Sequence, residues 1–254
     1  MMQLESPMKK IVKFKFGYCP CCEKYTIFTA SGYWFREKYV CNRCRSNPRQ
    51  RAIMVMLKKL CENWEDLHIH ESSPSGATFE RIKRTCTNYT YSYFYPEKKL
   101  GQFLDDERRI TNQNLQELTF SNDVFDLFIT QDVLEHVNEP QKALKEIYRC
   151  LKPGGMHIFT VPAKPFKETT PRIKIENGKV VPIMEEQYHG NPISEKGSLV
   201  TYDWGGDVVR IKDSLTGFKT EVVNFWRSKE NNHMGLEADC LQVFISTKPQ
   251  KVIS

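Results

Sequence analysis

The sequence has no run of about 18 uninterrupted apolar residues, the length that a membrane-spanning helix requires. Residues 1–15 mix charged and apolar side chains, so we expect no secretory signal, no membrane partner and a cytoplasmic location. Global disorder is excluded, because 40% of the 254 residues are hydrophobic and 12% are aromatic. This length accommodates one large domain, or one domain with a small module.

The sequence also lacks an even number of cysteines: it has nine, which cannot all pair within one chain. Without an export signal, metal binding is a better explanation for them than a disulfide framework. Four cysteines follow the pattern C-x2-C-x18-C-x2-C, namely Cys19, Cys22, Cys41 and Cys44. Two residues between thiolates let both sulfurs turn onto one ion, and four thiolates complete a closed tetrahedral site. The spacing therefore predicts a structural Zn²⁺ site.

The remaining cysteines have different predicted roles. Cys21 is a surplus thiol beside the first pair, and a ligand set that uses it instead leaves a poorer spacing. The other four are scattered singly in apolar surroundings and are predicted to be core residues: Cys61, Cys86, Cys150 and Cys240.

The charge is divided unevenly along the chain. Residues 1–60 hold 13 Lys/Arg and 3 Asp/Glu, which gives +10, whereas residues 61–254 hold 24 and 28, which gives −4. Two segments of opposite sign suggest two modules, which we expect at 1–61 and 62–254.

The first module is predicted to contain a hairpin and a helix. Residues 25–29 and 33–35 are β-prone, with Gly32 as the turn, and Asn47 and Pro48 are typical of a helix start. The apolar spacing predicts a helix over 48–60. Four arginines lie near its start, and they could bind a phosphate or carboxylate or pair with the acidic second module: Arg43, Arg45, Arg49 and Arg51.

The second module alternates strands and helices. Strands are predicted at 67–70, 89–95, 125–130, 156–161, 218–226 and 240–247, and helices at 79–86 and 141–151. This alternation predicts an α/β domain with a mostly parallel sheet. Ligands of such sheets bind beyond the carboxyl ends of the strands, so the turns after Glu71, Tyr93, Ile110 and Ile129 should meet around one cleft.

Three motifs resemble a known family. Residues 123–136 read DVFDLFITQDVLEH, residues 151–155 read LKPGG and residues 159–162 read FTVP. In content and spacing they resemble class I S-adenosylmethionine-dependent methyltransferases, most nearly the small type 11 domains. The resemblance covers about residues 64–162 and the last two strands. It implies a Rossmann-like methyltransferase sheet with helices on both faces, and a transferase that uses S-adenosylmethionine.

The resemblance also implies a cofactor site. The family opens this site with an acidic residue followed by three alternating glycines. Here the acid is Glu71, and the glycine positions hold Ser73, Ser75 and Ala77, with Gly76 between the last two. Small side chains still allow the backbone to approach the methionine part of the cofactor, and Glu71 would face its ammonium end.

Two further cofactor positions depart from the family pattern. The strand over 89–95 ends without the usual ribose-binding acid, and Glu97 is the nearest, out of register. Near the adenine, where the family has an Asp, this chain has Asn114 and Leu115, and the Asn114 carbonyl could accept a hydrogen bond from the adenine amine. Gln131 would lie between cofactor and acceptor.

Methyl transfer from a sulfonium is an in-line displacement, and a base is needed only when the acceptor carries a proton. The candidate catalytic residues are Asp132 and His136, after the fourth strand, and His189, with one of the two histidines as the acceptor base. His189 lies in an insertion at about 163–217, which is too long for a simple connection and is predicted to form a substrate lid. Its aromatic residues, Tyr188, Tyr202 and Trp204, suit sugar rings or planar acceptors.

Three functions compete. The first is O-methylation of a small-molecule or saccharide acceptor. The second is methylation of an RNA base, with the basic zinc module holding RNA; against it, the Asn/Asp-Pro-Pro-aromatic tetrapeptide of RNA-type enzymes is absent after the fourth strand, where residues 131–134 read QDVL. The third is a non-catalytic methyltransferase-like binding protein.

Overall fold

The computed structural model describes residues 12–32, 34–107, 109–191, 193–225, 233–238 and 241–250. Tyr33, Pro192 and Cys240, as well as residue 226 at the end of one predicted strand, lie outside the described residues. None of the described helices is long and apolar enough to cross a membrane.

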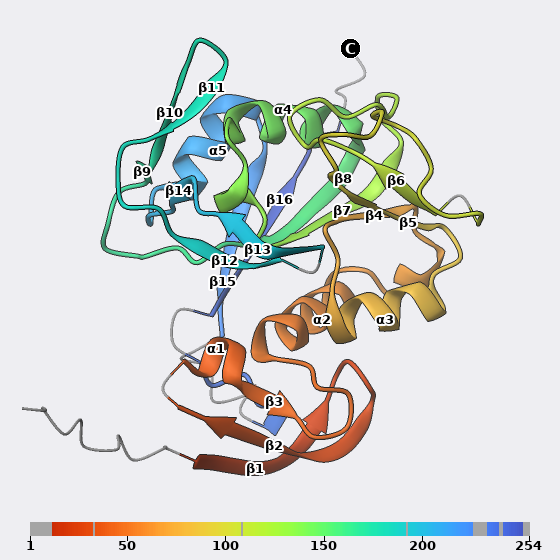
Figure 1. The fold of residues 1–254 in the computed structure, drawn as a ribbon. Helices are drawn as coiled ribbons and strands as arrows, with labels where there is room; N and C mark the ends of the chain where they lie inside the picture. The colour runs from red at the N-terminus through yellow and green to blue at the C-terminus, as the bar shows by residue number, and fades with distance from the viewer. Residues whose placement is uncertain are drawn as a thin grey trace, which may run out of the picture.

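A seven-stranded sheet forms the centre of the molecule (Figure 1). In spatial order its strands are β15 (Lys219–Asn224), β16 (Gln242–Thr247), β8 (Leu151–Thr160), β7 (Phe125–Gln131), β4 (Ile69–Ser72), β5 (Tyr89–Tyr93) and β6 (Ile110–Asn112). The five from β8 to β6 are parallel, whereas β16 is antiparallel to both of its neighbours. The predicted α/β fold with a mostly parallel sheet is confirmed.

Helices cover both faces of this sheet (Figure 1). They are α2 (Pro48–Leu60), α3 (Gly76–Thr85), α4 (Pro140–Cys150) and α5 (Val208–Thr216). Alternate side chains of a strand enter opposite cores, so Leu127 and Ile129 pack with α2 and α3, while Phe128 packs with α4. Phe125 also joins the α4 core, because the pairing of β7 with β8 shifts register between Phe125 and Leu127. A parallel sheet needs both faces covered, and the near-continuous apolar run in β7 reflects this burial.

The N-terminal module is a three-stranded antiparallel sheet of β1 (Val12–Cys19), β2 (Lys24–Ser31) and β3 (Tyr39–Cys41), with α1 (Phe35–Lys38) between the last two. The predicted hairpin is therefore only partly right. The strands that pair with β2 are β1 and β3, and residues 34–35 start a short helix instead. Cys19 and Glu23 close the turn between β1 and β2, so the first cysteine pair lies in a hairpin turn.

The predicted start and end of α2 are confirmed. The Asn47 side chain accepts from the Gln50 backbone N–H, and the Gln50 side chain accepts from Asn47 in return, which is a complete capping box. The buried face of α2 packs on β8 and β16 as part of the main core. The boundary between modules at residue 61 stays a prediction.

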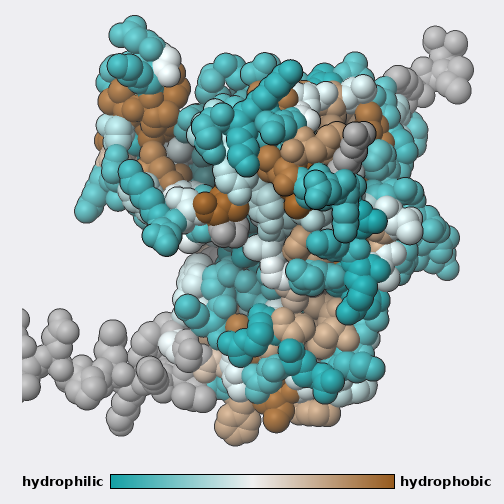
Figure 2. All heavy atoms as spheres, turned by 45° about the vertical axis from the view of Figure 1, so that its right-hand side comes forward, coloured by the Kyte–Doolittle hydropathy of each residue, from teal (hydrophilic) through white to brown (hydrophobic). Residues whose placement is uncertain are grey.

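The outer face of β1 and β2 is apolar and exposed, with Phe14 75% and Phe16 68% accessible. Figure 2 shows apolar surface at this lower end of the molecule and again at the upper left, over the β10–β11 hairpin. The opposite face of the small sheet is buried, where the Phe28 and Tyr39 rings pack beside the Arg51 guanidinium.

The predicted insertion folds into short strands. They are β9 (Thr170–Pro171), β10 (Ile173–Glu176), β11 (Lys179–Pro182), β12 (Tyr188–Asn191), β13 (Ser194–Leu199) and β14 (Tyr202–Asp203), and α5 follows within the predicted range. Thr201 ties this region to the short 3₁₀ helix η2 (Leu134–His136), because its N–H and hydroxyl both donate to the Glu135 carbonyl.

Gly76, the first residue of α3, has a φ of +71°, and a Cβ there would collide with the side-chain amide of Gln50. Gly178 has a similar φ of +75° but open space around it. We expect Gly178→Ala to lower the free energy of unfolding by about 1 kcal/mol, the cost of left-handed backbone, and Gly76→Ala by about 2–3 kcal/mol, since a clash is added. Urea unfolding measures both, and equal losses would contradict a tight contact between α2 and α3.

Candidate functional site

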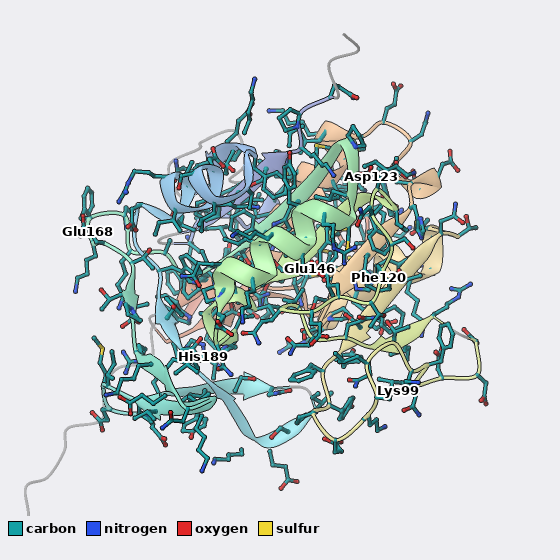
Figure 3. The ribbon with its side chains drawn as sticks, turned by 90° about the horizontal axis from the view of Figure 1, so that it is seen from above. Lys99, Phe120, Asp123, Glu146, Glu168 and His189 are labelled. Carbon is teal, nitrogen blue, oxygen red and sulfur yellow. The ribbon has the colours of Figure 1, made fainter. Side chains whose placement is uncertain are left out.

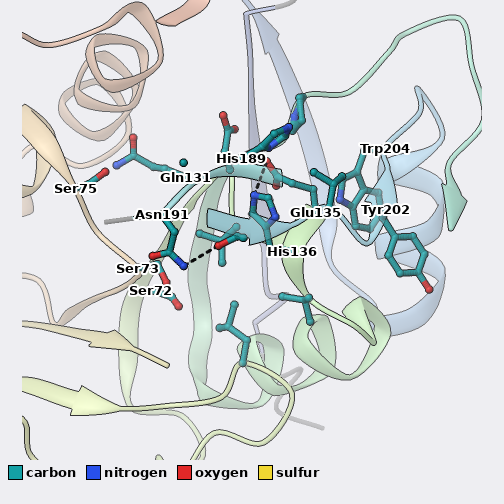
Figure 4. Close-up of a pocket in the computed structure, with 18 of the residues that line it drawn as sticks. Ser72, Ser73, Ser75, Gln131, Glu135, His136, His189, Asn191, Tyr202 and Trp204 are labelled. Carbon is teal, nitrogen blue, oxygen red and sulfur yellow. Dashed lines mark hydrogen bonds and ion pairs between the residues drawn. The ribbon is translucent and has the colours of Figure 1, made fainter. Parts of the chain in front are cut away.

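A cavity of about 1130 Å³ opens at the carboxyl edge of the parallel strands. Its wall includes the residues that follow β4, β5 and β6, namely Ser73, Phe94 and Gln113, and the last residue of β7, Gln131. The prediction that these turns meet around one cleft is confirmed. Figure 4 shows Ser72, Ser73 and Ser75 at one end, His136, His189, Tyr202 and Trp204 at the other, and Gln131 between them.

The turn after β4 is tight and places small side chains at the cavity wall. Ser73 has a φ of +52°, and its N–H donates to the Ser92 carbonyl of β5. Ser73 and Ser75 line the large cavity, whereas Gly76 lines a smaller one beside the cysteines. The backbone thus turns sharply at the cavity wall without the usual glycines, because a serine occupies the left-handed position.

Glu71 is fully buried and is not among the residues that line the cavity. Its carboxyl accepts from the Tyr89 hydroxyl at 2.6 Å and from the Gln131 amide at 2.7 Å. Burial raises the pKa of Glu71 to about 7, against the lowering effect of these two donors. Gln131 therefore stands between Glu71 and the cavity. Its own carbonyl oxygen is buried without a hydrogen-bond partner among the described residues.

The other predicted cofactor residues lie along the same wall. Tyr93 and Phe94 line the cavity where the family has its ribose acid, and Glu97 is not in the lining. Asn114 and Leu115 both line it, and the Asn114 side-chain oxygen already accepts from the Gln116 N–H at 3.0 Å.

Asp132 lies in the cavity wall as an ion pair with the N-terminal module. Arg36 of α1 donates to both carboxylate oxygens, with Nη2 to Oδ1 at 2.7 Å, and the Thr160 hydroxyl donates at 2.8 Å. Arg49 adds a contact at 3.2 Å. These cations hold the pKa of Asp132 below its usual range despite burial. Asp132 is thus a fully paired carboxylate, and no sequence signal had singled out Arg36.

Of the four arginines near the helix start, two contact the second module: Arg49 pairs with Asp132, and the buried Arg51 donates to the Gly235 carbonyl as well as to that of Tyr39 in the first module. Arg43 and Arg45 are exposed.

His136 and His189 come together, with ring centroids 5.1 Å apart in an edge-to-face arrangement. His136 belongs to η2 and His189 to β12, so they come from the fourth strand's exit and from the insertion. Figure 3 shows His189 and Asp123 near opposite ends of α4, as expected if His189 lies at the carboxyl edge of the sheet. Burial lowers the pKa of both histidines, so both are neutral at pH 7.

Glu135 completes this group and was missed by the sequence reasoning. It is fully buried, it lines the cavity, and neither side-chain oxygen has a hydrogen-bond partner among the described residues. One ligand atom each from Glu135, His136 and His189 lie within 4.8 Å of one another.

The predicted cysteine ligands also meet. The sulfurs of Cys19, Cys22, Cys41 and Cys44 lie within 4.8 Å of one another, while Cys21 is buried outside this group. Cys19 and Cys44 are 3.6 Å apart, and Cys22 and Cys41 are 4.0 Å apart. Each short distance joins one thiol of the first pair to one of the second, which a shared tetrahedral ion would require.

Comparisons with known proteins agree with this architecture. Residues 73–159 match the family model described as "Methyltransferase domain". A sarcosine/dimethylglycine N-methyltransferase of Aphanothece halophytica is 36% identical over 61 residues, which is 24% of this chain and 22% of that protein. The chain thus matches about a fifth of the length of this curated relative.

Two solved structures are similar in fold. The amino pentose methyltransferase of Micromonospora echinaspora, solved with S-adenosylmethionine bound, has a TM-score of 0.50 at 14% identity and covers 80% of this chain and 92% of its own. An S-adenosylmethionine-dependent methyltransferase from Mesorhizobium loti has a TM-score of 0.48 at 16% identity, with coverage of 77% and 97%. Residues 73–159 therefore match a methyltransferase domain model, and the chain has a Rossmann-like α/β fold.

The Arg36–Asp132 pair generates a stability prediction. We expect Arg36→Ala to lower the free energy of unfolding at pH 7 by about 2–4 kcal/mol, because a buried carboxylate loses its main partner. The folded pKa of Asp132 lies below the unfolded value, so its stabilisation is present above about pH 4 and is lost as the pH falls through the folded pKa. The difference between variant and wild type should therefore shrink in acid.

Urea unfolding at several pH values measures this difference, with the exposed Arg43→Ala as the control for lost charge. A loss from Arg36→Ala that is the same at pH 7 and pH 3 would show that packing, and not the ion pair, is responsible.

Proposed function

We propose that the protein is an S-adenosylmethionine-dependent methyltransferase that methylates an oxygen of a small-molecule or saccharide acceptor. The observation that carries the proposal is the two-ended cavity: the serine turn after β4 forms one end, and the two neutral histidines form the other. A cofactor at the first end would present its methyl group toward an acceptor at the second.

The residues present fit this cofactor. The Gln131 carbonyl oxygen is a buried acceptor without a partner in the described chain, and it would accept from the cofactor's ammonium group. Glu71 is hydrogen-bonded behind Gln131 and fixes the direction of its amide, so its role is indirect. Ser73 and Ser75 would bound the methionine part, and Asn114 and Leu115 the adenine. No acid lines the ribose position among the described residues, so Tyr93 would take that contact.

The cofactor supplies a methyl group on a positively charged sulfur. The S–CH₃ bond breaks as the O–CH₃ bond forms, the electron pair of the broken bond stays on sulfur, and the acceptor's proton must leave. What this chain contributes is the alignment of cofactor and acceptor within the cavity. Asp132 is a positioning residue in this scheme, because its pairing with Arg36 fixes the backbone where β7 enters η2.

His136 and His189 are proposed to activate the acceptor hydroxyl, most simply as the base. Both are neutral at pH 7, as a base must be before it takes a proton. The Trp204 indole lies in the same wall, stacked on Tyr202 with centroids 5.9 Å apart, and its N–H has no partner among the described residues. Trp204 is only 2% exposed, so the half-buried Tyr202 ring stacked on it is the one that would meet the apolar face of a sugar.

We propose further that the four clustered thiolates hold a structural Zn²⁺. The RNA alternative has less support, because Lys13, Lys15, Arg36, Arg49, Arg51 and Lys58 of the basic module bind acids or carbonyls of the same chain. Because these side chains are already paired within the chain, much of the positive charge of the module is not available to bind the phosphates of RNA.

Calorimetry with S-adenosylmethionine and its demethylated product tests the proposal. We expect the wild type, His136→Ala and His189→Ala all to bind both molecules. Transfer of a labelled methyl group to a panel of hydroxylated small molecules and saccharides should fall by about 10²–10⁴ in each histidine variant, the usual contribution of a positioned base. His68→Ala, at the other edge of the sheet, is the control. No heat and no thermal shift at millimolar cofactor would favour a non-catalytic binding protein.

Metal analysis of the purified chain tests the zinc proposal. We expect one zinc per chain, lost in Cys22→Ser and in Cys44→Ser but kept in Cys21→Ser, because Cys21 lies outside the cluster. A chelator should lower the melting temperature of the wild type, since the free energy of metal binding contributes to folding. Equal zinc in Cys21→Ser and Cys22→Ser would mean that the ligand set is wrong.

A further inference from the structure

The cavity holds a buried carboxylate whose charge is not accounted for. Glu135 has both side-chain oxygens buried, and neither receives a hydrogen bond from the described residues. A carboxylate in this position is costly unless it is protonated or meets a cation. Arg36 and Arg49 face it electrostatically, but their guanidinium groups bind Asp132 and Glu37.

His136 presents a lone pair to the same carboxylate. Its Nδ1 lies 2.9 Å from the Leu199 carbonyl, which can only accept, so Nδ1 carries the proton. In the neutral ring, Nε2 is then an unprotonated acceptor, and it lies 4.0 Å from Glu135 Oε1. The Glu135 carboxylate and His136 Nε2 are thus two hydrogen-bond acceptors that face each other, and no donor from the described residues lies between them. A backbone carbonyl that fixes the tautomer in this way is typical behind a metal-bound histidine.

We propose that Glu135, His136 and His189 form a binding site for a divalent metal ion at the acceptor end of the cavity. Two ligand atoms that are each about 2.1 Å from one ion lie at most about 4.2 Å apart, and the 4.0 Å between Glu135 and His136 falls within this limit. The ligand atom of His189 lies within 4.8 Å of both, so a side-chain shift of about half an ångström closes the set.

The chemistry of the donors and their surroundings indicates the kind of ion. Two imidazoles and one carboxylate suit Mn²⁺, Fe²⁺, Co²⁺ or Zn²⁺, and three protein ligands leave positions for water or an acceptor. The site also differs from the cysteine cluster in having no sulfur, so a hard ion such as Mn²⁺ separates the two sites experimentally.

The role of the ion, although not its binding, rests on the proposed function. A hydroxyl coordinated to the ion loses its proton more readily, and the proton would pass to solvent as the oxygen accepts the methyl group. With the ion bound, both imidazoles are ligands, so they would activate the acceptor through the metal and not as free bases.

Titration with Mn²⁺ of the full-length protein that carries no more than one Zn²⁺ per chain, followed by the electron paramagnetic resonance signal of free Mn²⁺, tests the site without any acceptor or cofactor. We expect one Mn²⁺ per wild-type chain, and a loss of affinity of at least tenfold in Glu135→Gln, His136→Ala and His189→Ala. The matched control is Glu139→Gln, which removes a carboxylate four residues further on that pairs with Lys142 on the surface.

Thermal unfolding distinguishes the loss of metal binding from misfolding of a variant. Mn²⁺ should raise the melting temperature of the wild type and of Glu139→Gln, but not that of Glu135→Gln, which without metal should be at least as stable as the wild type because a buried charge is gone. Absence of Mn²⁺ binding by the wild type, or binding unchanged in Glu135→Gln and both histidine variants, would overturn the site. The Mn²⁺ titration and thermal unfolding are both done without S-adenosylmethionine, so their outcome does not depend on whether the cofactor binds.

Discussion

The buried contact between Arg36 and Asp132 connects the small cysteine module to the edge of the sheet where chemistry takes place. Arg36 lies on α1, which connects β2 to β3 between the two cysteine pairs of the sequence. Asp132 is the residue after β7. A buried guanidinium and a buried carboxylate each cost several kcal/mol unless they meet. The module must therefore pack where it does, and in doing so it supplies Trp34, Arg36 and Arg49 to the cavity wall. Its cysteine cluster lies at the turn before β2 and at the end of β3, the two strands that flank α1.

The carboxyl groups of Glu71, Asp132 and Glu135 lie at the carboxyl edge of the sheet, and each has a different environment. Glu71 is surrounded by neutral donors, and burial raises its pKa to about 7. Asp132 meets two arginines and stays ionised. Glu135 is as deeply buried as Glu71, whereas Asp132 is half-buried. Glu135 accepts no hydrogen bond through its side chain from the described residues, and the charge of Asp132 nearby adds to the cost of ionising it. A buried carboxyl group needs either hydrogen-bond donors or a cation. The chain itself provides these for Glu71 and Asp132, and their absence around Glu135 among the described residues indicates that a bound cation is its partner.

The sequence was informative where structure depends on local signals. The capping box at Asn47 and the apolar run in β7 predicted their elements closely, since neither needs a distant partner. The segment after Gly32 was predicted to be a strand from its aromatic residues, yet α1 begins there, because β3 supplies the pairing that β2 needs. Intrinsic strand preference is weak compared with such tertiary pairing.

Local sequence signals do not identify Arg36 or Glu135 as residues of the site, and the reason is the same for both. Each is an ordinary charged residue in sequence, and its importance comes only from burial beside a residue far away in the chain. The insertion provides the clearest example. His189 and Glu135 meet because Thr201 fixes the insertion against η2. A surface excursion would not need this attachment, in which the Thr201 N–H donates to the Glu135 carbonyl and its hydroxyl lies within hydrogen-bond distance of the Glu135 and Val137 carbonyls. The insertion is therefore part of the site, and the shape of the acceptor pocket depends on the hairpins that it forms.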